Sequence, residues 1–142
     1  MKLSNLFILP LFATTALSAP AFNVSITYDQ TYDNKAGSLS TVACSNGKNG
    51  LLTRGFTTFG SLPSFPNIGG GFPVTGWNST ACGGCWNIAF NESSINVILV
   101  DTANPGFNLA LGAMMKLTKQ AVQLGRINGI ATPIDGPHCG LK

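Results

Sequence analysis

Charge is scarce in this sequence of 142 residues. Only 9% of the residues are Asp, Glu, Lys or Arg, against roughly 25% in an ordinary globular domain. The eight basic residues are scattered, and no two of them are adjacent. Because a nucleic-acid-binding domain normally gathers Lys and Arg on one face, the sequence argues against nucleic acid as a partner. Hydrophobic residues make up 44%, which excludes the disordered class, poor in apolar residues.

Residues for acid–base or nucleophilic catalysis are also few. The chain has one histidine, His138, and no Gly-x-Ser-x-Gly segment of a serine hydrolase. Hydrolysis of a glycoside requires two carboxyl groups around the scissile bond. The chain offers five: Asp29, Asp33, Glu92, Asp101 and Asp135. All but Asp101 lie in turn-rich segments, where such side chains commonly bind the backbone. We therefore expect no enzymatic activity and no catalytic residues, metal or cofactor.

Only one long apolar run is present, and it lies at the start of the sequence. Lys2 precedes the run Leu3–Leu17, and small residues follow it. This order is typical of a secretory signal peptide, and the run is shorter than the roughly 20 residues of a membrane-spanning helix. We predict a leader at residues 1–18 with cleavage near 18–21, a single domain at 19–142, and a secreted, extracellular product. Three sequons are then candidate N-glycosylation sites: Asn23, Asn78 and Asn91.

Cysteine is infrequent as well. The four residues are Cys44, Cys82, Cys85 and Cys139. In an exported protein an even number predicts disulfides, here two bonds with three possible connectivities. The close Cys82–Cys85 pair also suits zinc or redox chemistry, but structural zinc sites usually contain two such pairs, and the exterior of the cell is oxidising. Two disulfides are therefore favoured, and this reasoning leaves their pairing open.

Short strands and turns dominate the remaining sequence. We predict strands at five places: Val24–Tyr28, Ser38–Cys44, Trp86–Phe90, Ile95–Val100 and residues 126–134. The third and fourth flank a polar turn and predict a hairpin. Asn108–Thr118 has helical spacing with Asn108 as its N-cap, whereas the Pro- and Gly-rich residues 60–77 predict a long ordered loop. Several short strands and one helix indicate a small β-barrel with a helix packed against it.

The aromatic residues admit two interpretations. Four phenylalanines in or near the long loop would either form an exposed apolar patch or close one end of the barrel, which we favour: Phe56, Phe59, Phe65 and Phe72. Trp77 and Trp86 flank the close cysteine pair. Although indoles often stack on sugars, a core position is favoured, because a tryptophan after a half-cystine usually packs on the disulfide.

Segments along the whole chain together resemble one known family. They include Cys44-Ser45-Asn46-Gly47, Gly76-Trp77-Asn78-Ser79, Cys82-Gly83-Gly84-Cys85-Trp86, Gly106-Phe107-Asn108-Leu109-Ala110 and Cys139-Gly140-Leu141. In this order they resemble the cerato-platanins, small secreted fungal proteins. The resemblance implies a mainly β fold with short helices, a six-stranded double-ψ β-barrel shared with expansin first domains. It also implies the disulfides Cys44–Cys82 and Cys85–Cys139. Gly69–Phe72 departs from the usual pattern and is expected to change the local loop shape.

The resemblance further implies non-hydrolytic binding of chitin, that is N-acetylglucosamine oligomers, and of cell-wall polysaccharide. It also implies that the protein loosens the wall and has a place in the fungal cell wall. A plant receptor would recognise it as an elicitor of defence. The related expansins and hydrolases carry an aspartate in a His-Phe-Asp-Leu motif where this chain has Asn108, and an amide cannot donate a proton as an acid does. The carbohydrate-binding residues carried over are Asp101, Asn108 and Gln120, with Asn96 and Leu124 as weaker candidates.

Each of these candidates also has a structural interpretation. Asp101 ends an apolar strand, so it either binds sugar hydroxyls or accepts local backbone N–H groups. Gln120 would otherwise be an ordinary surface residue at a helix end. Two rival functions remain: a surface-active cell-wall coat protein that self-assembles without specific glycan binding, and a weak glycan hydrolase, which the few carboxylates disfavour.

Overall fold

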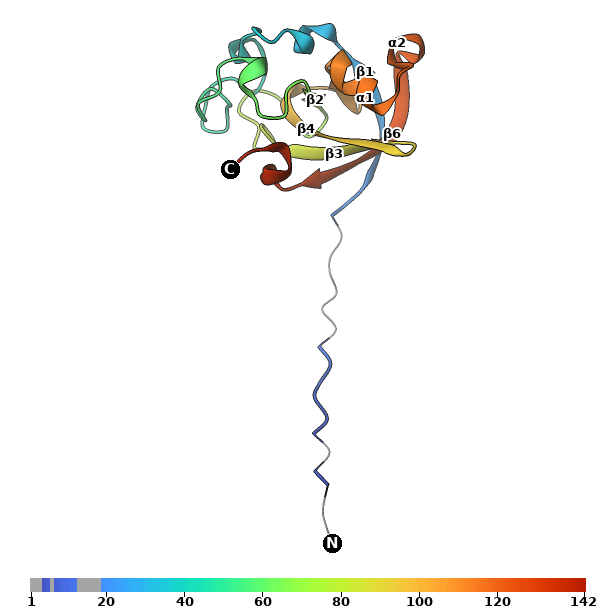
Figure 1. Cartoon of the computed structure of the whole chain (residues 1–142). Helices are drawn as coiled ribbons and strands as arrows, with labels where there is room; N and C mark the ends of the chain where they lie inside the picture. Colours follow the sequence, from blue (N-terminus) through green and yellow to red (C-terminus); the bar gives the residue numbers. More distant parts are fainter. Residues whose placement is uncertain (1–3, 6, 13–18) are drawn as a thin grey trace.

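The computed structural model describes residues 4–5, 7–12 and 19–142. In this part of the chain, six strands close a barrel in the order β1-β5-β2-β4-β3-β6 (Figure 1). Their bounds are β1 Phe22–Tyr28, β2 Ile68–Gly71, β3 Cys85–Phe90, β4 Ser93–Thr102, β5 Phe107–Leu109 and β6 Arg126–Ile134. The pairs β1–β5 and β2–β4 are parallel and the other four are antiparallel. The predicted six-stranded barrel is confirmed.

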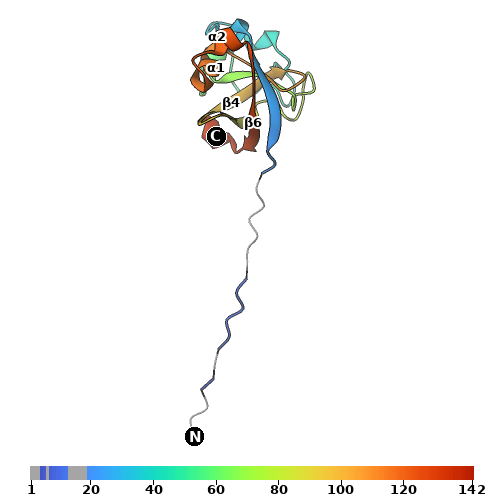
Figure 2. The same ribbon diagram turned by 90° about the vertical axis from the view of Figure 1, so that its right-hand side faces the viewer.

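Two short α-helices and four 3-10 helices complete the fold. The α-helices are α1 Leu111–Leu117 and α2 Ala121–Leu124, and the 3-10 helices are η1 Gln30–Asp33, η2 Leu39–Thr41, η3 Phe59–Ser61 and η4 Gly136–Cys139. Both α-helices and η1 lie over one end of the barrel (Figures 1 and 2). Buried Ala113, Met114 and Leu117 belong to the hydrophobic core, so α1 closes that end with its apolar side.

The strands with alternating residues form as predicted. Val24 and Ile26 of β1 are buried while Ser25 and Thr27 are half-buried, as expected for a strand with one face on the core. The hairpin prediction is confirmed by β3 and β4. Asn91 in their turn has φ 51°, a left-handed conformation that asparagine tolerates better than most residues.

The predicted loop at 60–77 contains a buried strand, β2, which the sequence reasoning missed. Its residues Ile68-Gly69-Gly70-Gly71 lie between β4 and β5 and are all buried. A Cβ on Gly69 would overlap the Asn108 carbonyl oxygen, and one on Gly70 would lie 2.6 Å from the Thr102 carbonyl oxygen. Gly69 and Gly70 therefore allow neighbouring backbone to approach closely, and Gly71 makes room for the Phe107 and Leu99 side chains. They form a strand where an ordered loop was expected.

Two further local predictions are wrong. Ser38–Cys44 is not a strand: η2 occupies Leu39–Thr41, and the Ser38 hydroxyl accepts a hydrogen bond from the Ser40 amide. Such short side-chain bonds to the backbone compete with strand formation. The helix predicted from Asn108 begins instead at Leu111, because Asn108 belongs to β5 and Ala110 is the N-cap.

A distant carboxylate caps α1. Asp33 of η1 accepts hydrogen bonds from the backbone N–H groups of Leu111 and Gly112, both at 2.8 Å. These are two of the N–H groups that have no partner within the helix. The cap thus comes from a residue almost eighty positions earlier, which explains why local reasoning placed it at Asn108.

Two disulfides link the loops to the barrel. Cys44 pairs with Cys82, and Cys85 of β3 pairs with Cys139 of η4. This is the pairing that the resemblance implies. Trp86 is in the core as predicted, whereas the prediction for Trp77 is wrong, since it is 63% exposed and donates to the Asn46 side chain.

The loop phenylalanines pack on the core. Phe59 is buried, and the other three are partly buried against the core cluster. The rings thus pack inward as favoured, but at separate places: Phe59 contacts Tyr32, whereas Phe72 contacts Trp86 and Phe107. The four rings therefore form no large exposed patch.

The predicted leader lies in large part outside the described residues, which omit 1–3, 6 and 13–18. Its cleavage near 18–21 therefore stays a prediction, as does the domain division at that point. Within the described part of the chain, no helix has the length and apolar character needed to cross a membrane.

Candidate functional site

Strand register places five residues in one row across the outside of the barrel. Arg126 of β6 pairs with Thr27 of β1, Thr27 with Asn108 of β5, Asn108 with Gly70 of β2, and Gly70 with Asp101 of β4. Paired residues of adjacent strands present their side chains to the same face. Ile26 and Phe107, which adjoin Thr27 and Asn108 in the chain, are fully buried, so this row faces outward. We call these five residues the outer row.

Asp101 stands at one end of the outer row and is held by three protein donors. Its Oδ1 accepts from the backbone N–H of Ala43 at 3.1 Å and of Thr102 at 2.9 Å. Its Oδ2 accepts from the Tyr32 hydroxyl at 2.9 Å. Two of these donors come from distant loops, so Asp101 joins η1 and the segment before Cys44 to β4. The two oxygens of a carboxylate offer about four acceptor positions. With three protein donors bound, Asp101 can still accept a hydrogen bond from a ligand.

Burial and the neighbouring Asp101 carboxylate alter the ionisation of Tyr32. The side chain is buried, and burial, together with the adjacent Asp101 carboxylate, raises the pKa of its hydroxyl well above the usual value. Tyr32 consequently stays a neutral hydrogen-bond donor to Asp101 at physiological pH. This donor fixes the orientation of the carboxylate.

Asn108 and Gly70 form the middle of the outer row. Asn108 Oδ1 accepts from the Thr27 hydroxyl at 3.0 Å. In the described part of the chain, Asn108 Nδ2 donates no hydrogen bond, so its two N–H groups are available to a ligand. Gly70 has no side chain between Asp101 and Asn108. The row therefore has an acceptor and a donor on two sides of Gly70, whose own backbone is covered by Thr102 and Ala103.

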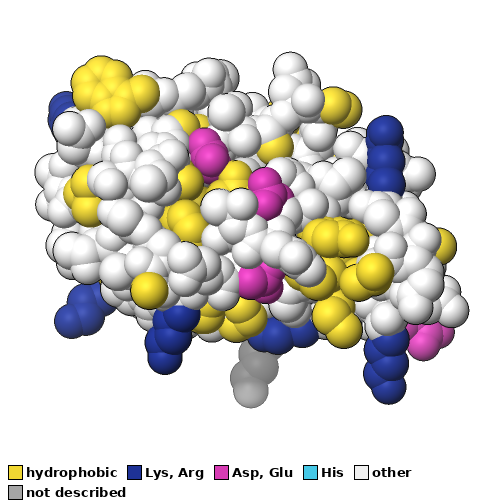
Figure 3. Space-filling view, turned by 90° about the horizontal axis from the view of Figure 1, so that it is seen from above, with side chains coloured by type: hydrophobic (Ala, Val, Ile, Leu, Met, Phe, Trp, Pro, Cys, Tyr) yellow, Lys and Arg dark blue, Asp and Glu magenta, His cyan; other side chains and the backbone are white. Residues whose placement is uncertain are grey.

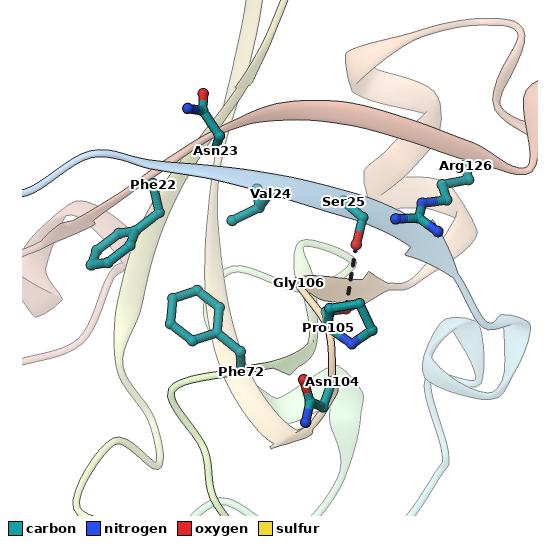
Figure 4. Close-up of a pocket in the computed structure, with 9 residues that line it drawn as sticks. All are labelled: Phe22, Asn23, Val24, Ser25, Phe72, Asn104, Pro105, Gly106 and Arg126. Carbon is teal, nitrogen blue, oxygen red and sulfur yellow. Dashed lines mark hydrogen bonds between the residues drawn. The ribbon is translucent and has the colours of Figure 1, made fainter.

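Two pockets adjoin the row on the Arg126 side. The first, of about 280 Å³, is lined by Thr27, Asn108, Thr102 and Arg126 among others, and we call it the row pocket. The second, of about 400 Å³, contains Phe22 and Phe72 in its wall, and we call it the aromatic pocket (Figure 4). Both share Ser25, Asn104, Pro105 and Arg126, so they are direct neighbours, and we call the two pockets together the trough.

The other predicted binding residues lie apart from this group. Gln120 and Leu124, both exposed, are at the two ends of α2, and neither lines the row pocket. Leu124 precedes Arg126 by two residues. Asn96 lies further along β4, where its side chain accepts from Asn87 at 2.9 Å and donates to the His138 carbonyl oxygen at 3.2 Å. The structure thus brings Asp101 and Asn108 into one row and leaves the other three outside it.

The three sequons differ in accessibility. Asn23 and Asn91 are exposed. Asn78 is half-buried, and its Oδ1 accepts a hydrogen bond from the backbone N–H of Asn49 at 2.9 Å. In Figure 4 the Asn23 side chain points away from the aromatic rings. Their glycosylation stays a prediction.

Several acidic side chains lie near the middle of the face seen from above and another lies at its lower right edge, whereas Lys and Arg side chains are seen around the edge (Figure 3). Asp29, Asp33 and Asp101 are all engaged by backbone N–H groups. Among the described residues no group of three or more His, Cys, Asp and Glu is arranged to hold a metal ion.

Comparison with known proteins shows the family to which the chain belongs. The cerato-platanin family model matches residues 24–141, which include the whole outer row. The chain belongs to the cerato-platanin family. Allergen Asp f 15 of Aspergillus fumigatus is 43% identical over 141 residues, covering 93% of this chain and 92% of that protein.

Solved cerato-platanins have the same fold. Cerato-platanin 2 from M. perniciosa has a TM-score of 0.81 at 46% identity, covering 84% of this chain and all of that one. The fungal elicitor cerato-platanin has a TM-score of 0.72 at 38% identity, covering 82% of this chain and 96% of that one. An expansin mutant of Clavibacter michiganensis, solved with cellohexaose, has a TM-score of 0.59 at 12% identity over 82% of this chain and 51% of that one. This last similarity concerns the fold alone, which is expansin-like.

Sequence reasoning missed Arg126, Thr27 and Gly70 as members of the row. The alternation of β1 shows that Thr27 faces outward, and this signal was available. Arg126 and Gly70 gave no such signal, because their place beside Asn108 depends on which strands pair. The order of strands around a barrel is a property of long-range contacts rather than of local sequence.

Proposed function

We propose that this cerato-platanin binds chitin and N-acetylglucosamine oligomers, with related wall polysaccharide, along the outer row without hydrolysing them. The observation that carries the proposal is the register that puts Asp101 and Asn108 on two sides of Gly70. The acetamido group of N-acetylglucosamine has one N–H donor and one carbonyl acceptor. Asp101 supplies an acceptor and Asn108 Nδ2 a donor, and hydrogen bonds to a charged group are worth about 1.5–3 kcal/mol.

The proposed absence of hydrolysis is supported by the carboxylates of the row. Glycosidases use two carboxyl groups, about 5–5.5 Å apart in retaining enzymes and 6.5–9.5 Å in inverting enzymes. Asp101 is the carboxylate of the outer row, and an amide stands at Asn108. Asp29 accepts from the Thr31 amide, and Asp33 is committed to α1. These bonds support structural roles for both.

Secretion, a place in the fungal cell wall, wall loosening and elicitation of plant defence complete the proposal. One of the solved relatives is described as a fungal elicitor, and the expansin neighbour was solved with a cellulose oligomer. We extend both properties to this chain as hypotheses. Cellohexaose is accordingly a second ligand to test beside chitin oligomers.

Calorimetric titration of the deglycosylated protein with tetra-N-acetylchitotetraose tests the binding. Asn108→Ala should lower the affinity about tenfold, equivalent to about 1.4 kcal/mol. Asn96→Ala is the matched control, because Asn96 lies on the same strand as Asp101 but outside the row, and it should bind like the wild type. Equal affinities of the two variants would contradict the site.

A reducing-sugar assay on the same samples tests the absence of hydrolysis. We expect no sustained release from chitin or cellulose oligomers. Release that Asp101→Asn abolishes would contradict the proposal and favour the hydrolase alternative. Lack of any binding at millimolar oligomer, combined with concentration-dependent scattering and lowered surface tension, would favour the surface-active coat protein instead.

A further inference from the structure

Arg126 is a cation without an anionic partner in the described part of the chain. It is exposed at the start of β6, and its guanidinium makes no ion pair or side-chain hydrogen bond with a described residue. Neither lining of the trough contains an aspartate or a glutamate. The five N–H donors of the guanidinium are therefore available to a ligand. Figure 4 shows this side chain at one end of the aromatic pocket.

Two aromatic rings form the opposite end of that pocket. Phe22 and Phe72 lie with their centroids 5.4 Å apart in an edge-to-face arrangement. Phe72 also packs on Trp86 at 5.8 Å and on Phe107 at 5.7 Å, so the core holds it in place. Phe22 is 37% exposed. The apolar C–H face of a sugar ring can be buried against such rings.

Between the two ends the pocket is polar. The Ser25 hydroxyl and the Pro105 carbonyl oxygen lie 3.4 Å apart, and the Asn104 amide is beside them (Figure 4). A volume of about 400 Å³ is within the range of small-molecule sites, which combine apolar walls with a few placed polar groups. One end thus fits an anion, the middle fits hydroxyl groups and the other end fits a ring face.

We propose that the aromatic pocket is a subsite for a hexuronate residue of a glycan, with the sugar carboxylate bound by Arg126. The planar guanidinium matches a carboxylate with two parallel hydrogen bonds, which a lysine cannot reproduce. The shared residues of the trough lead from this subsite to Asn108, so a glycan chain can continue into the outer row. That continuity rests on the proposed function. The subsite itself depends only on Arg126 and the pocket.

The test compares tetragalacturonate with its methyl ester, which has the same ring structure and no charge. The deglycosylated protein is titrated with each, and backbone amide shifts are followed by NMR. The acid should bind at least about tenfold more tightly, a difference of about 1.4 kcal/mol, and should shift the amides of Ser25, Gly106 and Arg126. Equal binding of acid and ester by the unmodified protein would overturn the proposal without any variant.

Variants then assign the preference to the guanidinium. Arg126→Gln should remove the preference for the acid, and Arg126→Lys should retain only part of it. Arg54→Gln, at an exposed arginine outside the trough, should keep it. A preference that survives in Arg126→Gln would overturn the subsite, as would displacement of tetragalacturonate by an equal concentration of inorganic phosphate, which would indicate an unselective anion site.

A titration with tetra-N-acetylchitotetraose tests the chitin function separately from the hexuronate subsite. Binding of this neutral oligomer without any acid preference contradicts the hexuronate subsite and leaves the proposed chitin function intact. An acid preference without chitotetraose binding contradicts the chitin function and leaves the subsite intact. The two failures are therefore distinguishable.

Discussion

The two ends of the outer row differ in how firmly the protein holds them. Asp101 accepts three hydrogen bonds from the protein, whereas Arg126 at the other end makes none with described side chains. One end is therefore part of the folded structure as well as a candidate ligand contact. The other end is free to serve the ligand alone. Substitutions at Asp101 will mix stability with binding, and those at Arg126 will separate them.

The largest expected effect comes from removing the disulfide near Asp101. Cys44→Ser with Cys82→Ser should lower the free energy of unfolding by about 2–5 kcal/mol, measured by urea denaturation. Because Ala43 adjoins Cys44 and donates to Asp101, hydrogen exchange of the Ala43 amide should accelerate more than that of the β1–β6 amides. The pair Cys85→Ser and Cys139→Ser is the control. Uniform acceleration in both double variants would mean that no disulfide holds the Asp101 end specifically.

Asp101→Ala should come next, with a loss of about 2–4 kcal/mol in the free energy of unfolding. The substitution leaves the Tyr32 hydroxyl and two backbone N–H groups without their acceptor, and bonds to charged groups are worth about 1.5–3 kcal/mol each but are not additive. Asn108→Ala, which removes one hydrogen bond from Thr27, should cost less than about 1 kcal/mol. Similar losses of unfolding free energy in the two variants would contradict the distinction between Asp101, which the fold needs, and Asn108, which it does not.

A pH titration isolates the Tyr32 contribution. Its folded-state pKa lies above the usual value of about 10, so the folded protein holds this proton more tightly than the unfolded chain. The resulting stabilisation is fully present below about pH 10 and is lost as the pH rises above it toward the folded-state pKa, by up to about 1.4 kcal/mol per pH unit. The difference in unfolding free energy between wild type and Tyr32→Phe should therefore shrink above pH 10. Tyr28→Phe is the control, and an identical pH dependence of both variants would contradict the Tyr32–Asp101 interaction.

The smallest effect on stability is expected for Arg126→Gln. An exposed side chain without a protein partner should change the free energy of unfolding by less than about 0.5 kcal/mol. Urea denaturation measures this directly. A loss above 1 kcal/mol would mean that Arg126 has a structural role after all, and the contrast between the two ends would disappear.

Local sequence patterns predicted several strands. The strand at Val24–Tyr28 was predicted from its alternating residues and is confirmed. The hairpin around Asn91, predicted from two apolar runs and a polar turn, is confirmed as well, as is the strand at residues 126–134. The glycine strand β2 carried no such pattern, because close approach of β4 and β5 determines its composition. Asp33 caps α1 across the fold, and no nearby residue indicates this.

The candidate site could be predicted from the sequence only in part. The place of Asp101 at a strand end and the asparagine at 108 could be obtained from the sequence and the resemblance. Their position around Gly70, and the presence of Arg126 in the same row, depend on the order of strands in the closed barrel. Of the two interpretations of Asp101, the structure realises the backbone contact through Thr102 and adds two distant partners. The ligand contact stays a prediction.

Mapping of backbone amide shifts with tetra-N-acetylchitotetraose tests the central claim most directly. The outer row predicts shifts that saturate together at Thr27, Gly70, Asp101 and Asn108, while the amides of Asn87 in β3 and of its partner Asn96, earlier in β4, stay unchanged. Shifts concentrated at Asn87 and Asn96, or no shifts at millimolar oligomer, would contradict the outer row as the glycan site.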